Sequence, residues 1–332
     1  MIFITGATGF LGAHLLYHLL KENNEVLVLK RPESRIDYIR KIFTTYGKEV
    51  DKLFDKIQWM EGDVTDYASL IQIEQPIEKI YHLAAMVSFD PRDREKLLET
   101  NVLGTSNMID FALERNISEF IHMSSVAALD PVKADQYVTE KQFGNNPERK
   151  SVYAESKFKS ELEVWRGIEE GLKALILNPS VVIGPGMSGN SSGKIFSSIK
   201  NGLSFYPGGI TGFVDVRDVC KIILELTEKE AYNERFIINE GNYSYRKLFA
   251  IIAHEYGIKE PTKRLKPYLS QLLYKLDWTK SALTGKKRIL TKELHQSMHN
   301  KTLFSNDKLQ KTLNHPFIPI EQTVQDTLKH LL

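Results

Sequence analysis

A glycine-rich turn near the amino terminus constrains this chain more than any other feature. The apolar run Ile2–Ile4 and Thr5 lead into the turn Gly6-Ala7-Thr8-Gly9-Phe10-Leu11-Gly12, after which leucines recur at helical spacing as far as Lys21. Glycine has no Cβ, so the backbone of such a turn can approach a bound group closely, and the following helix directs free N–H groups at a phosphate. This order predicts the first unit of a dinucleotide-binding sheet. We expect the pyrophosphate to contact Gly6, Thr8, Gly9, Phe10, Leu11 and Gly12.

Segments typical of strands and helices alternate through the first part of the chain. Apolar runs at 26–29, 57–60, 79–83, 120–123 and 175–177 are separated by helical patterns, of which 37–53, 94–115 and 153–170 are the longest. The alternation predicts an α/β fold, a Rossmann-type doubly wound parallel sheet. We expect residues 1–178 to form the dinucleotide-binding domain, with a return segment near 210–240. Residues 179–332 are expected to form mainly a smaller, non-contiguous C-terminal substrate lobe and the last helices.

Composition excludes several classes of protein. The 332 residues are 42% hydrophobic and 26% charged, with a net charge of +2, which is typical of a globular protein and disfavours nucleic acid as the main partner. A single cysteine, Cys220, permits no internal disulfide and no cysteine-based zinc site, so we expect no metal and a reducing, cytoplasmic location. The sequence contains no apolar run of about 18 residues, so we expect no transmembrane segment, and the apolar start lacks the basic region of a signal peptide.

The end of the second expected strand bears on the choice of nucleotide. An NAD site needs an acidic residue there, whereas this chain has Lys30 and Arg31, and its first carboxylate is Glu33. Two cations favour a 2′-phosphate, so NADP is preferred over NAD, although the same cations could simply face solvent. Further cofactor contacts are expected at the ends of later strands, from Asp63, Val64, Leu83, Ala84 and Ala85.

A Tyr-x-x-x-Lys spacing places a phenol and an ammonium on one helix face. The ammonium favours the phenolate form of the tyrosine. Lowering the pKa of a phenol by about 3 units requires roughly 4 kcal/mol of interaction that favours the phenolate over the phenol. The spacing occurs four times, at Tyr17/Lys21, Tyr137/Lys141, Tyr153/Lys157 and Tyr243/Lys247. Only Tyr153/Lys157 begins a long helical pattern that returns to a strand, so we expect this pair to be catalytic.

Ser125 lies just after an expected strand, at the sheet edge where α/β proteins bind ligands. Its hydroxyl could hydrogen-bond a substrate carbonyl beside Tyr153. Nearby candidates for the pocket wall, Met86, Val87, Phe89, Val126 and Ile183, are apolar. We expect the substrate to contact Met86, Phe89, Val126 and Asn178.

These motifs together resemble those of the extended short-chain dehydrogenase/reductases, often called the NAD-dependent epimerase/dehydratase group. The matching segments are Thr5–Gly12, Gly62–Asp66, His82–Ser88, Asn101–Thr105, Met123–Ala128, Tyr153–Lys157, Leu177–Gly186 and Phe213–Val219. The resemblance implies that Ser125 is the catalytic serine, Tyr153 the acid–base and Lys157 its partner on the nicotinamide ribose. It also implies that Asn101 supports the site, that Pro179 to Val182 line the nicotinamide, and that two long helices form a homodimer.

Two branches of this group compete. Sugar-nucleotide enzymes usually carry Arg-Asp where this chain has Thr211-Gly212, and dehydratases usually carry an acidic pair where it has Val126-Ala127. The chain therefore looks closer to dihydroflavonol-reductase-like and 3β-hydroxysteroid-dehydrogenase-like members, which implies an NAD(P)-dependent oxidoreductase acting on the carbonyl or carbinol of an apolar small molecule. The alternatives are a nucleotide-sugar epimerase and a catalytically silent NADP-binding sensor or scaffold.

The basic segment 259–292 stands apart from this pattern. It holds ten Lys and Arg against Glu260 and Asp277, a local charge of +8, and its leucines 269, 272, 273 and 276 recur at helical spacing. One hypothesis is a lid helix over the pocket with a solvated basic end. The other is a surface for peripheral contact with a membrane or an acidic carrier.

Overall fold

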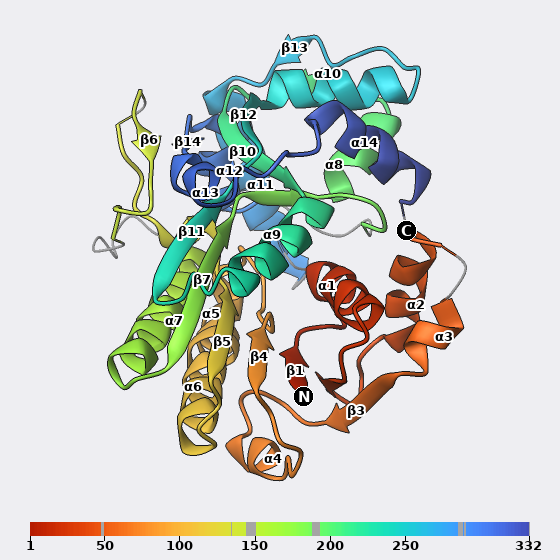
Figure 1. Cartoon of the computed structure of the whole chain (residues 1–332). Coiled ribbons are helices and arrows are strands. Elements are labelled where there is room, and N and C mark those ends of the chain that lie inside the picture. The colour runs from red at the N-terminus through yellow and green to blue at the C-terminus, as the bar shows by residue number, and fades with distance from the viewer. Residues whose placement is uncertain are drawn as a thin grey trace.

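A computed structural model describes residues 1–47, 50–133, 135–143, 151–187, 193–284, 288 and 290–331. Its centre is a seven-stranded sheet in the order β11-β7-β5-β4-β1-β2-β3, in which every neighbouring pair is parallel (Figure 1). The strands are β1 (Ile2–Thr5), β2 (Val26–Lys30), β3 (Ile57–Glu61), β4 (Lys79–His82), β5 (Glu119–Met123), β7 (Lys173–Pro179) and β11 (Glu234–Ile238). This sheet confirms the predicted Rossmann-type fold.

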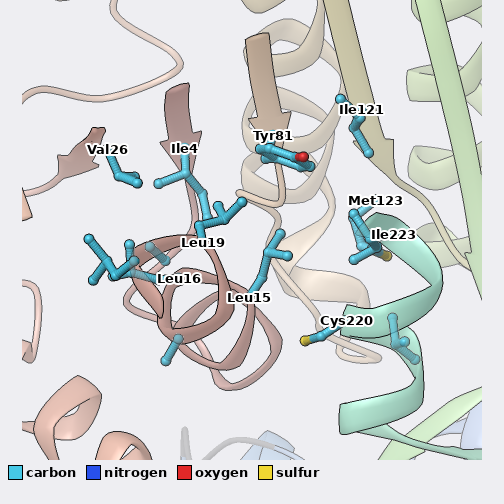
Figure 2. Close-up of a cluster of buried hydrophobic side chains, with 14 of the residues drawn as sticks. Ile4, Leu15, Leu16, Leu19, Val26, Tyr81, Ile121, Met123, Cys220 and Ile223 are labelled. Carbon is cyan, nitrogen blue, oxygen red and sulfur yellow. The ribbon is translucent and has the colours of Figure 1, made fainter. Parts of the chain in front are cut away.

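Helices cover both faces of the sheet, which explains why its strands read as continuous apolar runs. One face packs on α1 (Phe10–Lys21), α2 (Ile36–Thr44), α3 (Val50–Phe54) and α9 (Val216–Glu228). Figure 2 shows Leu15, Leu16 and Leu19 of α1 and Cys220 and Ile223 of α9 meeting side chains of the strands. The other face packs on α4 (Tyr67–Ile71), α6 (Gly104–Glu114) and α7 (Val152–Glu169).

Two helical patterns differ from the expectation. The single helix expected over 37–53 is two helices, α2 and α3, because the hydroxyls of Thr44 and Thr45 bond the carbonyls of Lys41 and Ile42 at the last turn of α2 and Gly47 follows. The long helix 94–115 runs as α5 (Arg94–Leu98), a π-helical turn (Glu99–Leu103) and α6. Such turns are frequent at functional sites, and this one contains Asn101.

A second group of elements lies at the top of Figure 1. A three-stranded sheet of β8 (Val181–Ile183), β10 (Ile210–Asp215) and β12 (Gly241–Ser244) packs on α8 (Gly193–Lys200), α10 (Tyr245–Glu255) and α14 (Ile320–Lys329). Between β10 and β12 the chain returns to the large sheet as β11. The proposed domain limits themselves stay a prediction.

The remaining elements are short or peripheral. The strand pairs are β6 (Tyr137–Val138) with β14 (Leu303–Phe304) and β9 (Phe205–Tyr206) with β13 (Lys263–Arg264). The helices are the 3-10 turns η1 (Pro91–Asp93) and η3 (Val126–Ala128), and α11 (Pro267–Thr284), α12 (Lys292–His299) and α13 (Asp307–Leu313).

The order of the strands indicates where in the sheet a ligand would bind. From β1 the chain proceeds to β2 on one side, whereas β4 and β5 lie on the other, so the topological switch point falls between β1 and β4. Ligands of open α/β sheets bind at the carboxyl ends of the strands at such a point. The glycine turn after β1 and the segment after β4 meet there.

Candidate active site

The glycine turn has no space for side chains at two of its glycines. Gly6 has a φ of +74°, and a Cβ on it would lie 2.5 Å from the backbone nitrogen of Ala84. A Cβ on Gly12 would lie 2.2 Å from the carbonyl oxygen of Gly6. Gly9 precedes α1, and no side chain of the described residues caps that end of the helix. The turn therefore fits a pyrophosphate, which needs both close backbone approach and free N–H groups; Thr8, Phe10 and Leu11 are half-buried around it.

A buried chain of hydrogen bonds fixes the end of β4 beside this turn. His82 Nδ1 lies 2.8 Å from Thr5 Oγ1, and its Nε2 lies 3.1 Å from Thr105 Oγ1. Burial lowers the pKa of His82 to about 3, so the ring is neutral. Because the Thr105 hydroxyl donates to the carbonyl of Asn101, it must accept from Nε2–H. Nδ1 then accepts from Thr5, whose oxygen accepts from the N–H of Ala84.

Asn101 lies at the centre of the π-helical turn and is fully engaged. Its Oδ1 accepts from the N–H of Met86 at 2.7 Å, and its Nδ2 donates to the carbonyl of Met86 and to Ser156 Oγ. Ser156 in turn donates to the carbonyl of Tyr153. Asn101 is 1% exposed. Because its hydrogen bonds join Met86 to Ser156, it aligns the Met86 segment with α7.

The structure brings Ser125, Tyr153 and Lys157 together at the carboxyl end of β5. Tyr153 lies in the first turn of α7, which Ser151 caps. Burial raises the pKa of the Tyr153 phenol, and a hydrogen bond with the Ser125 hydroxyl opposes that rise. Lys157 is buried, and its Nζ donates to the carbonyl of Met123 at 2.8 Å. Burial lowers the pKa of Lys157 to about 8 against the attraction of Glu161, so the ammonium stays mostly charged at neutral pH.

Beneath these residues lies an ion pair that the sequence analysis missed. Glu161, one turn beyond Lys157, accepts hydrogen bonds from Ser124 Oγ, from Asn178 Nδ2 at 2.6 Å and from Arg235 Nη1 at 3.2 Å. Arg235 also donates to the carbonyls of Glu140 and Gln142. Burial raises the pKa of Glu161, and these donors oppose the rise. A signal for Glu161 existed, because it stands four and eight residues after Lys157 and Tyr153, on the same helix face.

Asn178 differs from its expected position on the substrate wall. It is completely buried, and its Nδ2 donates to the carbonyl of Ser125 at 2.9 Å as well as to Glu161. Its place favours a role in holding Ser125. Among the other substrate candidates, Phe89 is exposed and its ring meets that of Tyr153 edge-on at 5.9 Å, and Met86 is half-buried. Val126 packs on a small core cluster, and Ile183 is buried in another core cluster.

The end of β2 carries paired cations. Lys30 Nζ lies 3.0 Å from Glu61 Oε2, and Arg31 Nε lies 3.1 Å from Glu33 Oε1. A cavity of about 370 Å³ opens beside them, lined by Arg31, Pro32, Glu33, Glu61, Gly62, Asp63, Asp66 and Ser69. Asp63 accepts two hydrogen bonds from Thr65.

Most of the remaining cofactor candidates lie at the same sheet edge, whereas Val182 lies in β8 of the three-stranded sheet. Val64 is buried against Gly104, and Pro179 is buried at the end of β7. The others are Leu83 and Ala84, which are half-buried, Ala85, which is exposed, and Val182, which is half-buried. Across the described residues, no three acidic, histidine or cysteine side chains gather as a metal site, and no helix is long and apolar enough to cross a membrane.

A glycine turn lies at the switch point of the sheet, and Ser125, Tyr153 and Lys157 lie together at the same edge. Residues 2–239 match the model of the NAD dependent epimerase/dehydratase family. The chain belongs to this family and is an enzyme of the extended short-chain dehydrogenase/reductase type.

The chain is similar to several curated proteins and solved structures. A Synechocystis protein provisionally named dihydroflavonol 4-reductase is 30% identical, over 78% of this chain and 73% of its own. Cinnamoyl-CoA reductase 1 of Petunia hybrida is 24% identical, over 100% and 92% of the two chains. The crystal structure of gox2253 has a TM-score of 0.81 at 25% identity, covering 99% of this chain and 97% of that one. UDP-glucose 4-epimerase of Thermotoga maritima shares the fold, with a TM-score of 0.76, 20% identity, and coverage of 99% and 97%.

Proposed function

We propose that this enzyme transfers a hydride between a nicotinamide cofactor and the carbonyl or carbinol of an apolar small molecule, with Ser125, Tyr153 and Lys157 at the reacting centre. The observation that carries the proposal is the Tyr153 phenol, which meets the Ser125 hydroxyl and the Phe89 ring above the buried Lys157 ammonium. The residues that would hold the cofactor are the Gly6–Gly12 turn, Ala84, Tyr153 and Lys157. When bound, the nicotinamide supplies or accepts the hydride.

The protein residues would handle the proton. Burial keeps the Tyr153 phenol protonated in the resting enzyme, so it can donate to an alkoxide as that charge develops. Ser125 would donate a hydrogen bond to the same oxygen. The Lys157 charge stabilises the phenolate that remains, and only one of its three N–H groups is needed for Met123.

The position of Gly212 supports the reductase branch. A Cβ there would lie 2.2 Å from Asn239 Oδ1 and 2.9 Å from Ser180 Cβ, so this backbone has no room for the aspartate that sugar-nucleotide enzymes usually carry. The exposed Phe89 beside Tyr153, and the exposed Val87 two residues before it, also favour an apolar substrate.

A turnover panel tests the proposed function. NADPH consumption is measured with hydrophobic aldehydes and ketones, and epimer formation is measured with UDP- and dTDP-sugars. We expect turnover in the first set only. Epimerisation of a sugar nucleotide would favour the epimerase, and NADPH binding without any conversion would favour the sensor.

Cofactor preference gives a separate prediction. We expect NADPH to bind more tightly than NADH by about 1–2 kcal/mol, a few-fold to about 30-fold, through Arg31. Arg31→Ala should remove most of this difference, whereas Glu33→Gln, which frees Arg31 from its carboxylate partner, should widen it. Titration of both cofactors measures the effect, with the nearby exposed Arg35→Ala as the control. Equal affinities in the unaltered enzyme would contradict the prediction.

We also propose a cytoplasmic homodimer formed through the two long helical segments, α5 to α6 and α7, which pack together and expose Leu103 and Leu162. Light scattering should give about twice the chain mass of 38.1 kDa. A mass of one chain at micromolar concentration would contradict this assembly.

A further inference from the structure

Helix α11 exposes most of its large apolar side chains. The exposed set is Tyr268, Leu272, Leu273, Leu276, Trp278 and Leu283, and Leu283 is 88% exposed. Leu269, Leu272, Leu273, Leu276 and Leu283 follow the spacing i, i+3, i+4, i+7 and i+14, so they form one stripe along the helix. A contiguous apolar stripe on a protein surface marks an interaction site.

The side of α11 that faces the protein carries mainly polar groups, with Tyr274 half-buried beside them. Ser270 and Ser281 are buried and Asp277 is half-buried, and these three positions lie within about 40° of one another around the helix axis. Ser270 Oγ lies 2.7 Å from His299 Nε2, and Asp277 accepts from the N–H of Leu290 at 3.0 Å. The usual pattern of a surface helix is therefore inverted, because α11 is held to the protein by polar groups and presents leucine outward.

Positive charge surrounds this stripe. Lys275 is exposed beside the stripe and Lys280 within it, and Lys263, Arg264 and Lys266 are exposed just before the helix. Of the two acidic residues in the 259–292 segment, Asp277 is turned toward the protein, so little negative charge offsets the ten cations. An isologous contact with a second copy would set this +8 segment against itself, which disfavours self-association.

We propose that the leucine stripe of α11 and its flanking lysines bind an anionic membrane surface, with the helix lying in the plane of the interface. The 18 residues of α11 span about 27 Å, enough for several leucines to enter the acyl boundary while the lysines reach headgroup phosphates. The exposed Tyr268 at the edge of the stripe suits the same boundary. This inference stands apart from the proposed function, because binding to a membrane needs no catalysis.

The helix also connects to the active-site edge. After α11, the main chain of Arg288 donates a hydrogen bond to the Asp90 carboxylate. Asp90 follows Phe89, whose ring meets Tyr153. The segment after α11 therefore contacts the segment that carries Phe89, so a membrane bound at α11 would lie near the proposed substrate wall.

Flotation with vesicles of phosphatidylcholine, with and without phosphatidylserine, tests the proposal. The protein should bind the anionic vesicles preferentially and lose binding as salt rises. Leu272→Gln/Leu276→Gln and Lys275→Gln/Lys280→Gln should each lower partitioning about 10-fold or more. The controls Ile71→Gln and Lys41→Gln/Lys173→Gln, at exposed sites elsewhere, should bind as the parent does. NADPH binding by every variant reports folding.

Three outcomes would overturn the proposal. One is no binding to either vesicle. Another is salt-sensitive binding that the leucine changes leave intact, which would assign the segment to a soluble acidic partner. The third is a fall in particle mass in the leucine variant without vesicle binding, which would assign the face to a second copy.

Discussion

Replacement of Tyr153 by phenylalanine is expected to lower turnover by at least about 100-fold while NADPH binding persists, the usual scale for a lost general acid–base. The substitution removes only the hydroxyl that meets Ser125, and the ring can keep its contact with Phe89. Lys157 and its bond to the Met123 carbonyl should be unaffected. Steady-state rates and NADPH titration separate the loss of chemistry from a loss of binding.

The chain supplies a matched control for this change. Tyr137 has the same Tyr-x-x-x-Lys spacing with Lys141, but it is 55% exposed on β6. Tyr137→Phe should leave the rate within about two-fold of the parent, as for a surface change without a catalytic role. An undiminished rate in Tyr153→Phe would remove Tyr153 from the proposed mechanism.

The second large effect is expected on stability, at the Glu161–Arg235 pair. Both side chains are almost fully buried, so Arg235→Met leaves the Glu161 carboxylate in the interior without its counterion. Breaking a buried pair in this way costs about 3–5 kcal/mol of unfolding free energy. Urea denaturation measures the loss. Lys159→Met, which breaks a half-exposed pair with Glu155 on the same helix, should cost less than about 1 kcal/mol.

A double change tests the cause of that loss. Adding Glu161→Gln to Arg235→Met removes the unpaired charge and keeps a partner for Ser124 and Asn178, so part of the stability should return. If Arg235→Met cost no more than Lys159→Met, the pair would not stabilise α7 against β11.

The sheet could be predicted because each of its strands carries its own signal. Strands buried on both faces are short apolar runs, and the Gly6–Gly12 turn marks the switch point directly. The three-stranded sheet of β8, β10 and β12 was not predicted as a sheet. Its strands are short, and their pairing joins residues about 30 positions apart, as between Val181 and Phe213 and between Phe213 and Gly241, so no local pattern encodes it.

The candidate site likewise combines features that a local sequence pattern encodes with features that only the fold brings together. Tyr153 and Lys157 share one helix and could be paired from spacing alone, whereas Arg235 reaches Glu161 across 74 positions, and only the fold brings them together. The cations at the end of β2 give a related case. Lys30 and Arg31 were visible in the sequence, but the β2–β3 register that sets Glu61 opposite Lys30 was not.

The central claim is net hydride transfer to an apolar carbonyl, and isotope transfer tests it most directly. NADPH with deuterium at both hydrogen positions of nicotinamide C4 is incubated with the enzyme and a hydrophobic ketone or aldehyde from the panel. We predict one deuterium on the carbinol carbon of the product for each NADPH oxidised, and a rate reduced in Tyr153→Phe. A carbinol without deuterium, or a sugar nucleotide epimerised with no NADPH consumed, would contradict the claim.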